Sequence, residues 1–292
     1  MANIAVRSPY FVSVSTSGGD YAILAVTAGG TTYNIRKDAT GYIDIADIAR
    51  DEVAPTYTGT LSTSSAGGAS VSGSYTIYEA DGTVVSSNQG SFSHTAYDGY
   101  GYFEDGNSID ITGTPLSGTE IWFPENTSGE IFTSQTATTA FTGTATSVSG
   151  ITINRFDCSK YTPIKAAFIN KFGVPQELYF FGAITEGVSS EGESYKVGAV
   201  NGTYSTTSHQ KKTLVKNGMV SYTVSTGFVS EVYNEYIREM MISEQVWLVI
   251  EGTVRPVHPV SSEVQLKTSL NNKLVDYTVQ FEQANDLIST VR

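Results

Sequence analysis

Short alternations of apolar and polar residues fill the first part of the chain. The stretch YFVSVSTSGGDYAILAVTAGGTTYNIRK breaks them at Gly-Gly pairs, which predicts three strands joined by tight turns. Ile43, Ile45 and Ile48 then lead from a further strand into a short helical turn. Pro55 ends that turn, because proline disfavours a helical conformation in the residue before it.

Turn sequences punctuate the next segment. A Ser/Gly-rich loop precedes a strand, a turn at Asp81-Gly82 and another strand. Further strands are predicted around Asp98-Gly99 and Asp105-Gly106. Together these elements predict an N-terminal antiparallel β-sandwich over residues 1–111, of the size usual for immunoglobulin or fibronectin type III domains.

The pattern changes twice after this domain. Residues 112–150 are rich in Ser, Thr and Gly, and they fit either a connection between domains or added strands. Residues 151–292 begin with the strong apolar runs ITINRFD, KAAFINKF and ELYFFGAI, which predict a second β-rich domain. The chain closes with a predicted turn at Asn271-Asn272, a strand and a short terminal helix.

One amphipathic helix is predicted inside the second domain, over about 229–242. Ser230 is a reasonable N-cap for it. Its apolar residues recur at intervals of three and four, as one face of a helix requires. They are Val229, Val232, Tyr233, Tyr236, Ile237, Met240 and Met241.

Composition supports a mainly β fold and limits the function classes. The chain has 292 residues, with 18 Tyr, 13 Phe and 28 Gly, which favour strands and turns. The net charge is −12, and no Lys or Arg lies between Arg50 and Arg155. That interval cannot supply the cationic surface on which nucleic-acid binding depends. No membrane-spanning segment or signal peptide is expected.

Residues able to catalyse a reaction are few. The histidines are His94, His209 and His258, and only His94 has a nearby acid in sequence, Asp98. No nucleophile-elbow motif accompanies them, so we interpret all three as surface or hydrogen-bonded residues. Cys158 is the only cysteine, which excludes an intramolecular disulfide and fits assembly in a reducing cytoplasm. Lys160 is close enough to lower its pKa, but a buried structural role is favoured.

Two weak binding patterns remain. The segment YDGYGYFEDGNSID concentrates oxygen ligands that could hold Ca²⁺, namely Asp98, Glu104, Asp105, Asn107 and Asp110. Asp-Gly pairs are also ordinary turn sequences, and turns are the favoured interpretation. Aromatic residues could form a carbohydrate-binding platform, although core packing is the usual role of such side chains. They are Tyr97, Tyr100, Tyr102, Phe103, Trp122 and Phe123.

Several segments resemble, in the same order, virion structural proteins of tailed bacteriophages, especially phages of marine and Bacteroidetes hosts. The segment DCSKYTPIKAAFINKFGVPQELYFF carries the resemblance most clearly. The others are RSPYFV, YIDIADIARDEV, AYDGYGYFEDG, TGFVSEVYNEYIREMMISEQVWL and LKTSLNNKLVDYTVQFEQANDLISTVR. The resemblance implies a tail or baseplate component and includes no catalytic motif.

The sequence therefore predicts a non-enzymatic structural protein without a cofactor. It would be assembled in the host cytoplasm, reside in the virion, form a ring-like homo-oligomer and dock to other virion proteins. No direct nucleic-acid binding and no membrane insertion are expected. The alternative function is a carbohydrate-binding adhesin or receptor-binding module.

Overall fold

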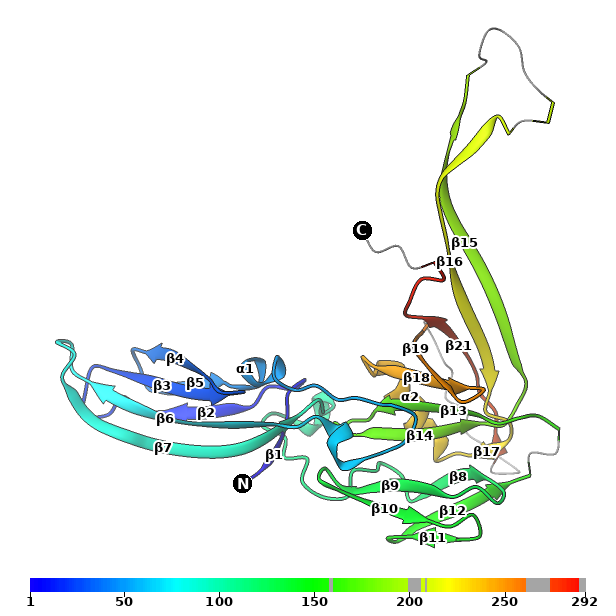
Figure 1. Ribbon diagram of the computed structural model, residues 1–292. Coiled ribbons are helices and arrows are strands. Elements are labelled where there is room, and N and C mark those ends of the chain that lie inside the picture. The colour runs from blue at the N-terminus through cyan, green and yellow to red at the C-terminus, as the bar shows by residue number, and fades with distance from the viewer. Residues whose placement is uncertain (158–159, 199–205, 208, 261–273, 289–292) are drawn as a thin grey trace.

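The computed structural model describes residues 1–157, 160–198, 206–207, 209–260 and 274–288. It confirms the mainly β fold, with several sheets and two short α-helices in the described part of the chain. An N-terminal sheet extends to one side of the C-terminal strands, and a long hairpin rises away from both (Figure 1).

The N-terminal sheet has five strands, and a smaller layer covers one face. In sheet order its strands are β1 (Asn3–Ala5), β7 (Val84–Tyr97), β6 (Ala69–Tyr78), β3 (Tyr21–Ala28) and β4 (Thr31–Lys37). The second layer consists of β2 (Phe11–Val14), β5 (Gly41–Asp44) and α1 (Ala46–Arg50). It is smaller than the second sheet of an immunoglobulin domain. The strands predicted before Asp98, the short helix and the turn at Asp81-Gly82 are present. The further strands predicted around Asp105-Gly106 were wrong, because residues 98–111 form loops and the 3-10 helix Phe103–Asp105 instead.

Alternation along β3 shows why this layer forms. Ala22, Leu24, Val26 and Ala28 are fully buried, while the residues between them are half-buried. This two-residue period places every second side chain on the face that β2, β5 and α1 cover. The result is a separate apolar core for the N-terminal part of the chain.

Residues 112–150 form strands rather than an irregular connection. The strands are β8 (Glu120–Pro124), β9 (Gly129–Ser134), β10 (Ala137–Phe141) and β11 (Ser147–Val148). β9 and β10 form a hairpin, while β8 pairs in parallel with β12 (Ile151–Phe156). Their apolar side chains, including Ile121, Phe123 and Phe141, join the large C-terminal core.

A seven-stranded antiparallel sheet organises the C-terminal part. Its order is β14 (Pro175–Phe180), β13 (Ile164–Ile169), β18 (Val246–Ile250), β19 (Thr253–Pro259), β21 (Thr278–Gln283), β16 (Lys211–Ser225) and β15 (Ile184–Lys196). β13 is buried along almost its whole length. The apolar run KAAFIN therefore forms a central strand of this sheet.

The predicted helix is present but begins later than expected. α2 spans Tyr233–Ile242, with Val232 at the N-cap position and no side-chain cap. Val229 and Ser230 instead form β17 (Val229–Ser230), which pairs with β20 (Leu274–Val275). The Ser230 hydroxyl donates to the Glu120 carboxylate. The proposed N-cap was therefore wrong, because this segment is part of a strand pair.

The predictions for the C-terminus have mixed outcomes. The predicted strand exists as β21. Residues 284–288 contain no helix, so the described half of the expected terminal helix is absent. The turn predicted at Asn271-Asn272 and the position of Cys158 lie outside the described residues.

Candidate functional site

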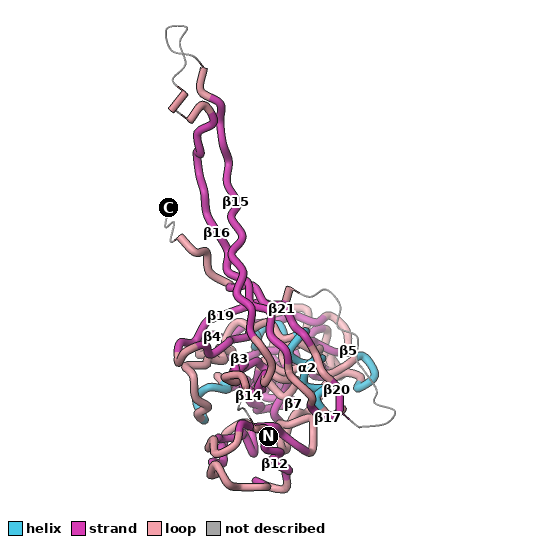
Figure 2. The backbone as a smooth tube through the Cα atoms, turned by 90° about the vertical axis from the view of Figure 1, so that its right-hand side faces the viewer, coloured by secondary structure: helices cyan, strands magenta, loops and turns pink. Residues whose placement is uncertain are grey.

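The long β15–β16 hairpin is the most exposed element of the described chain. Every residue of β15 from Ile184 to Lys196 has a partner on β16. β21 pairs with β16 only at Ser221–Ser225, so the two strands continue alone beyond that contact. We call this outer part, Val188–Lys196 with Lys211–Val220, the arm. It stands clear of the other strands in two perpendicular views (Figures 1 and 2).

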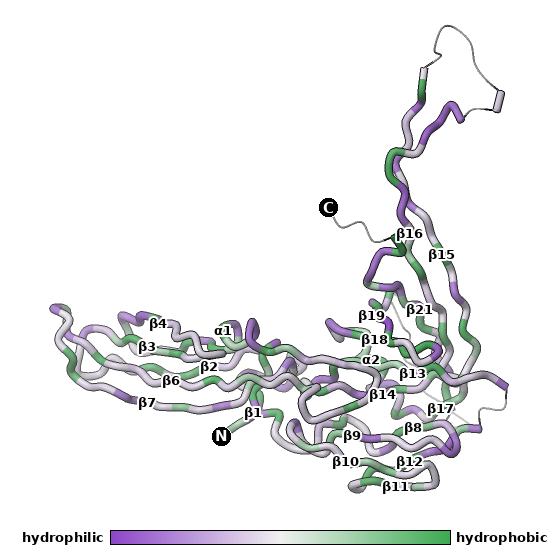
Figure 3. Tube along the Cα trace, in the orientation of Figure 1, coloured by the Kyte–Doolittle hydropathy of each residue, from purple (hydrophilic) through white to green (hydrophobic). Residues whose placement is uncertain are grey.

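The base and the outer part of the hairpin differ in sequence. At the base, Tyr222 and Val224 are buried in the C-terminal core. Farther out, the strands consist mainly of Ser, Gly, Thr, Glu and Lys, and short polar and apolar segments alternate along them (Figure 3). Val188 and Leu214 are each 65% exposed and Tyr195 is 50% exposed. The arm therefore has no core of its own.

Both long edges of the arm expose backbone. Within the described ranges, β15 is the last strand of its sheet and its outer edge has no neighbouring strand. On β16, Leu287 donates its backbone N–H to the Gly218 carbonyl at 2.8 Å, and Asn217 binds the same C-terminal segment. Among the described residues, Lys211–Lys216 has no strand on its outer side. Such edges can accept an additional strand.

A second distinctive region joins the N-terminal sheet to the C-terminal core. Segment 96–106, which follows β7 and includes the 3-10 helix Phe103–Asp105, meets the turn after β13. Tyr100 donates its backbone N–H to the Lys171 carbonyl at 2.9 Å. A Cβ atom on Gly99 would lie only 2.7 Å from that oxygen, and one on Gly173 would lie 2.8 Å from the Gly99 nitrogen. Both glycines allow the two backbones to approach.

Charged groups surround this junction. Arg7 and Arg50 both contact the Glu244 carboxylate, with N–O distances of 3.3 and 2.7 Å. The Arg7 guanidinium also lies over the Tyr100 ring at 5.0 Å. Burial raises the pKa of Asp98 to about 6, although Arg7 acts in the opposite direction. These contacts join residues from the start, the middle and the end of the chain.

Glu239 is the most deeply buried carboxylate of the junction. Its side chain accepts hydrogen bonds from the Ser117 hydroxyl and, at 3.3 Å, from the Lys171 backbone N–H. It is fully buried in α2, and burial raises its pKa to about 7. Nearby, the Tyr102 hydroxyl donates to Glu235 at 2.7 Å. α2 therefore anchors the segment that continues from the N-terminal sheet.

The histidines are far apart in the fold. The His94 ring packs beside Tyr10 and Phe92, and its Nδ1 accepts the Ala2 backbone N–H at 3.3 Å. Asp110, rather than Asp98, is the acid that acts on His94 electrostatically. His209 is exposed beyond the arm, and His258 is exposed on β19. The structure does not bring the three together.

The candidate calcium ligands are used as turn and cap acceptors. The Asp105 carboxylate accepts the Tyr102 backbone N–H at 2.8 Å, and Asp110 accepts backbone N–H groups of Thr112 and Asn3. Asp98 lies in the junction, while Glu104 is exposed on the 3-10 helix. No group of three or more metal-binding side chains occurs in the part of the chain that the structure describes.

The candidate aromatic residues do not form one platform. Tyr97, Tyr100 and Phe123 are buried, and Trp122 packs against Phe156 with ring centroids 6.3 Å apart. Tyr102 is half-buried, and only Phe103 is fully exposed. Core packing is thus the main use of these side chains.

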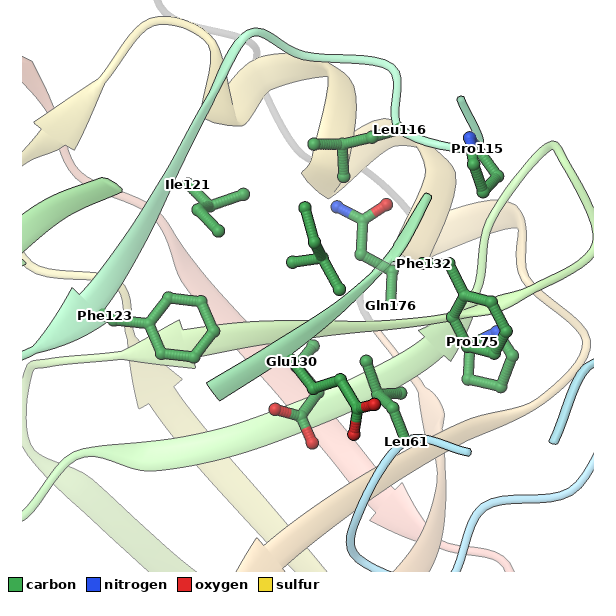
Figure 4. Close-up of a pocket in the computed structure, with 11 residues that line it drawn as sticks. Leu61, Pro115, Leu116, Ile121, Phe123, Glu130, Phe132, Pro175 and Gln176 are labelled. Carbon is green, nitrogen blue, oxygen red and sulfur yellow. The ribbon is translucent and has the colours of Figure 1, made fainter. Parts of the chain in front are cut away.

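A small cavity lies between β8, β9 and β14 (Figure 4). Its volume of about 20 Å³ suits roughly one water molecule. The Gln176 Nε2 atom beside it is buried without a hydrogen-bond partner, which such a water would satisfy. Nearby, Lys165 and Glu177 form an ion pair at 2.8 Å, to which the Tyr57 hydroxyl also donates. The cavity is too small for an organic substrate.

Sequence reasoning missed the role of Arg155. Its guanidinium donates to the carbonyl oxygens of Pro124, Thr127, Thr142 and Ala145, at 2.7–3.2 Å. One side chain thereby joins the loops after β8 and β10. The only sign of this role in the sequence was that Arg155 is the first cationic residue after a long interval without Lys or Arg.

The comparisons with known proteins add no relative. No family model matches the chain, and no curated protein or solved structure matches it. No helix in the described ranges is long and apolar enough to cross a membrane.

Proposed function

We propose that this chain is a non-enzymatic structural component of a bacteriophage virion, in its tail or baseplate. It acts by associating with copies of itself and by docking to other virion proteins. The observation that carries the proposal is the arm, whose backbone edges and apolar side chains are exposed in the single chain.

The arm favours assembly for a physical reason. From Lys211 to Ser221, β16 continues for about 33 Å at about 3.3 Å per residue. A two-stranded ribbon is only marginally stable in water, because it buries little apolar surface. A neighbouring strand would satisfy its free edges and cover Val188, Tyr195 and Leu214. If each copy offers a different surface to the next, the contacts form a ring when the rotation between copies closes.

The rest of the molecule is consistent with a structural role. The sequence segments that resemble phage virion proteins include AYDGYGYFEDG and KAAFINKFG, and these two meet at the junction. In the described part of the chain, no three His, Cys, Asp or Glu side chains are grouped so that they could hold a metal ion. These features support a protein whose role is structural.

Native mass spectrometry of the purified full chain, over a range of concentrations, tests this proposal. We expect one discrete homo-oligomer that persists without an added ligand. The same protein on a glycan array tests the alternative. A monomer at every concentration that binds a glycan saturably would overturn the structural proposal and favour an adhesin.

A further inference from the structure

We propose that the arms of neighbouring copies pair edge to edge, with β15 of one copy beside β16 of the next. The arms would then form a continuous antiparallel sheet around the ring. This inference rests on the proposed self-association and specifies the surface that produces it. The occupant of each free edge is a second copy of this chain.

The two strands of the hairpin carry opposite charge. β15 has three glutamates, Glu186, Glu191 and Glu193, and one lysine, Lys196. β16 has three lysines, Lys211, Lys212 and Lys216, and no acidic residue. One edge of the hairpin is therefore mainly acidic and the other is basic. An acidic edge and a basic edge are complementary surfaces for copies of the same chain.

The charges of the two strands form no ion pairs with each other in the described part of the chain. The register instead places Lys196 opposite Lys211 and Tyr195 opposite Lys212. Directly opposed like charges destabilise a strand pair.

The geometry of the hairpin permits the pairing. β15 runs outward and β16 runs back, so equivalent arms side by side alternate in strand direction. Lys216 is in register with Gly192, which places it at the level of Glu191 and Glu193 along the arm. In a ring with all arms pointing the same way, Lys216 of one copy would lie beside Gly192 of the next, at the level where that strand carries Glu191 and Glu193.

The charges also select among the possible pairings. Two-fold contacts would place β15 beside β15, or β16 beside β16. The first brings three glutamates to each side and the second brings three lysines to each side. Both are disfavoured by like-charge repulsion. The β15–β16 contact joins strands of opposite net charge, and because it uses two different surfaces it can close into a ring.

Charge reversal of each strand in the full-length protein tests this pairing. One variant is Glu191→Lys with Glu193→Lys, and the other is Lys212→Glu with Lys216→Glu. All four side chains are exposed, so the folded chain should be retained, as a thermal melt would verify. We expect each variant to raise the concentration needed for assembly by at least roughly tenfold. The quadruple variant, and an equimolar mixture of the two double variants, should assemble again.

A matched control reverses two exposed glutamates outside the arm, Glu125→Lys with Glu231→Lys. It changes the net charge as much as the β15 variant does, and it should assemble like the wild type.

If the wild type assembles and both double variants do so equally well, the arm pairing is wrong while self-association stands. If the quadruple variant and the mixture both stay monomeric, the β15–β16 pairing is also refuted. A wild type that never assembles overturns this inference together with the self-association on which it rests.

Discussion

Glu239 shows how a single buried carboxylate makes the junction sensitive to pH. Its pKa in the folded protein is about 7, compared with about 4.5 for an ordinary glutamate. The folded state therefore holds the proton more tightly than the unfolded state does. The corresponding stability is fully present below pH 4.5 and is lost as the pH rises to about 7.

Glu239→Gln should remove this pH dependence. The amide can still accept the Lys171 N–H and donate to the Ser117 oxygen, and it has no charge to bury. Between pH 5 and pH 8 the wild type should lose stability that the variant keeps. The free energy of unfolding of the variant, relative to that of the wild type, should therefore be about 2–3 kcal/mol higher at pH 8 than at pH 5. Chemical denaturation at both pH values measures this. Glu231→Gln, at an exposed carboxylate beside the same helix, is the control and should behave like the wild type at both.

At the level of elements, α2 is the part whose packing can be tested most simply. Ile237 is fully buried among the C-terminal core residues, and Ile242 on the same helix is 42% exposed. Ile237→Asp buries an unpaired charge and removes apolar contacts, so it should cost about 3–5 kcal/mol. Ile242→Asp should cost less than about 1 kcal/mol. Equal melting temperatures for the two variants would show that the helix face is not packed as described.

The sequence allowed some elements to be predicted and concealed others. Strict alternation marked β3, and the three-to-four spacing marked α2, because each has one face on a core. The arm has no core face, so its Ser, Gly, Glu and Lys residues produced no periodic signal. Ser230 looked like a helix cap because the pairing of β17 with β20 depends on a distant segment. The junction required Gly99 and Gly173 to meet, which no local pattern reveals.

On the scale of the whole molecule, charge limits the possible partners. The stretch from Asp51 to Asn154 contains eleven acidic residues and no Lys or Arg. It includes β6 and β7 of the N-terminal sheet and the strands β8 to β11. Such a surface repels polyanions within a Debye length of about 8–10 Å. In the proposed virion component, this charge would keep an outer surface soluble or let DNA pass a channel wall without adhering.

The full chain should accordingly not bind duplex DNA at physiological salt. A fluorescence titration with a labelled duplex measures this directly, with a basic DNA-binding protein as the positive control. Micromolar binding that weakens steeply with salt would contradict the charge argument, because that dependence is the signature of phosphate contacts.

The central claim is that the arm holds copies of this chain together. Electron microscopy of the purified full chain, compared with a variant lacking the arm, tests it most directly. In that variant an Asn-Gly turn replaces Ser189–Met219, which keeps the buried Val220 and closes the hairpin with a favoured two-residue loop. We expect rings of one defined symmetry for the full chain and single folded particles for the variant. Identical rings from both proteins would contradict it.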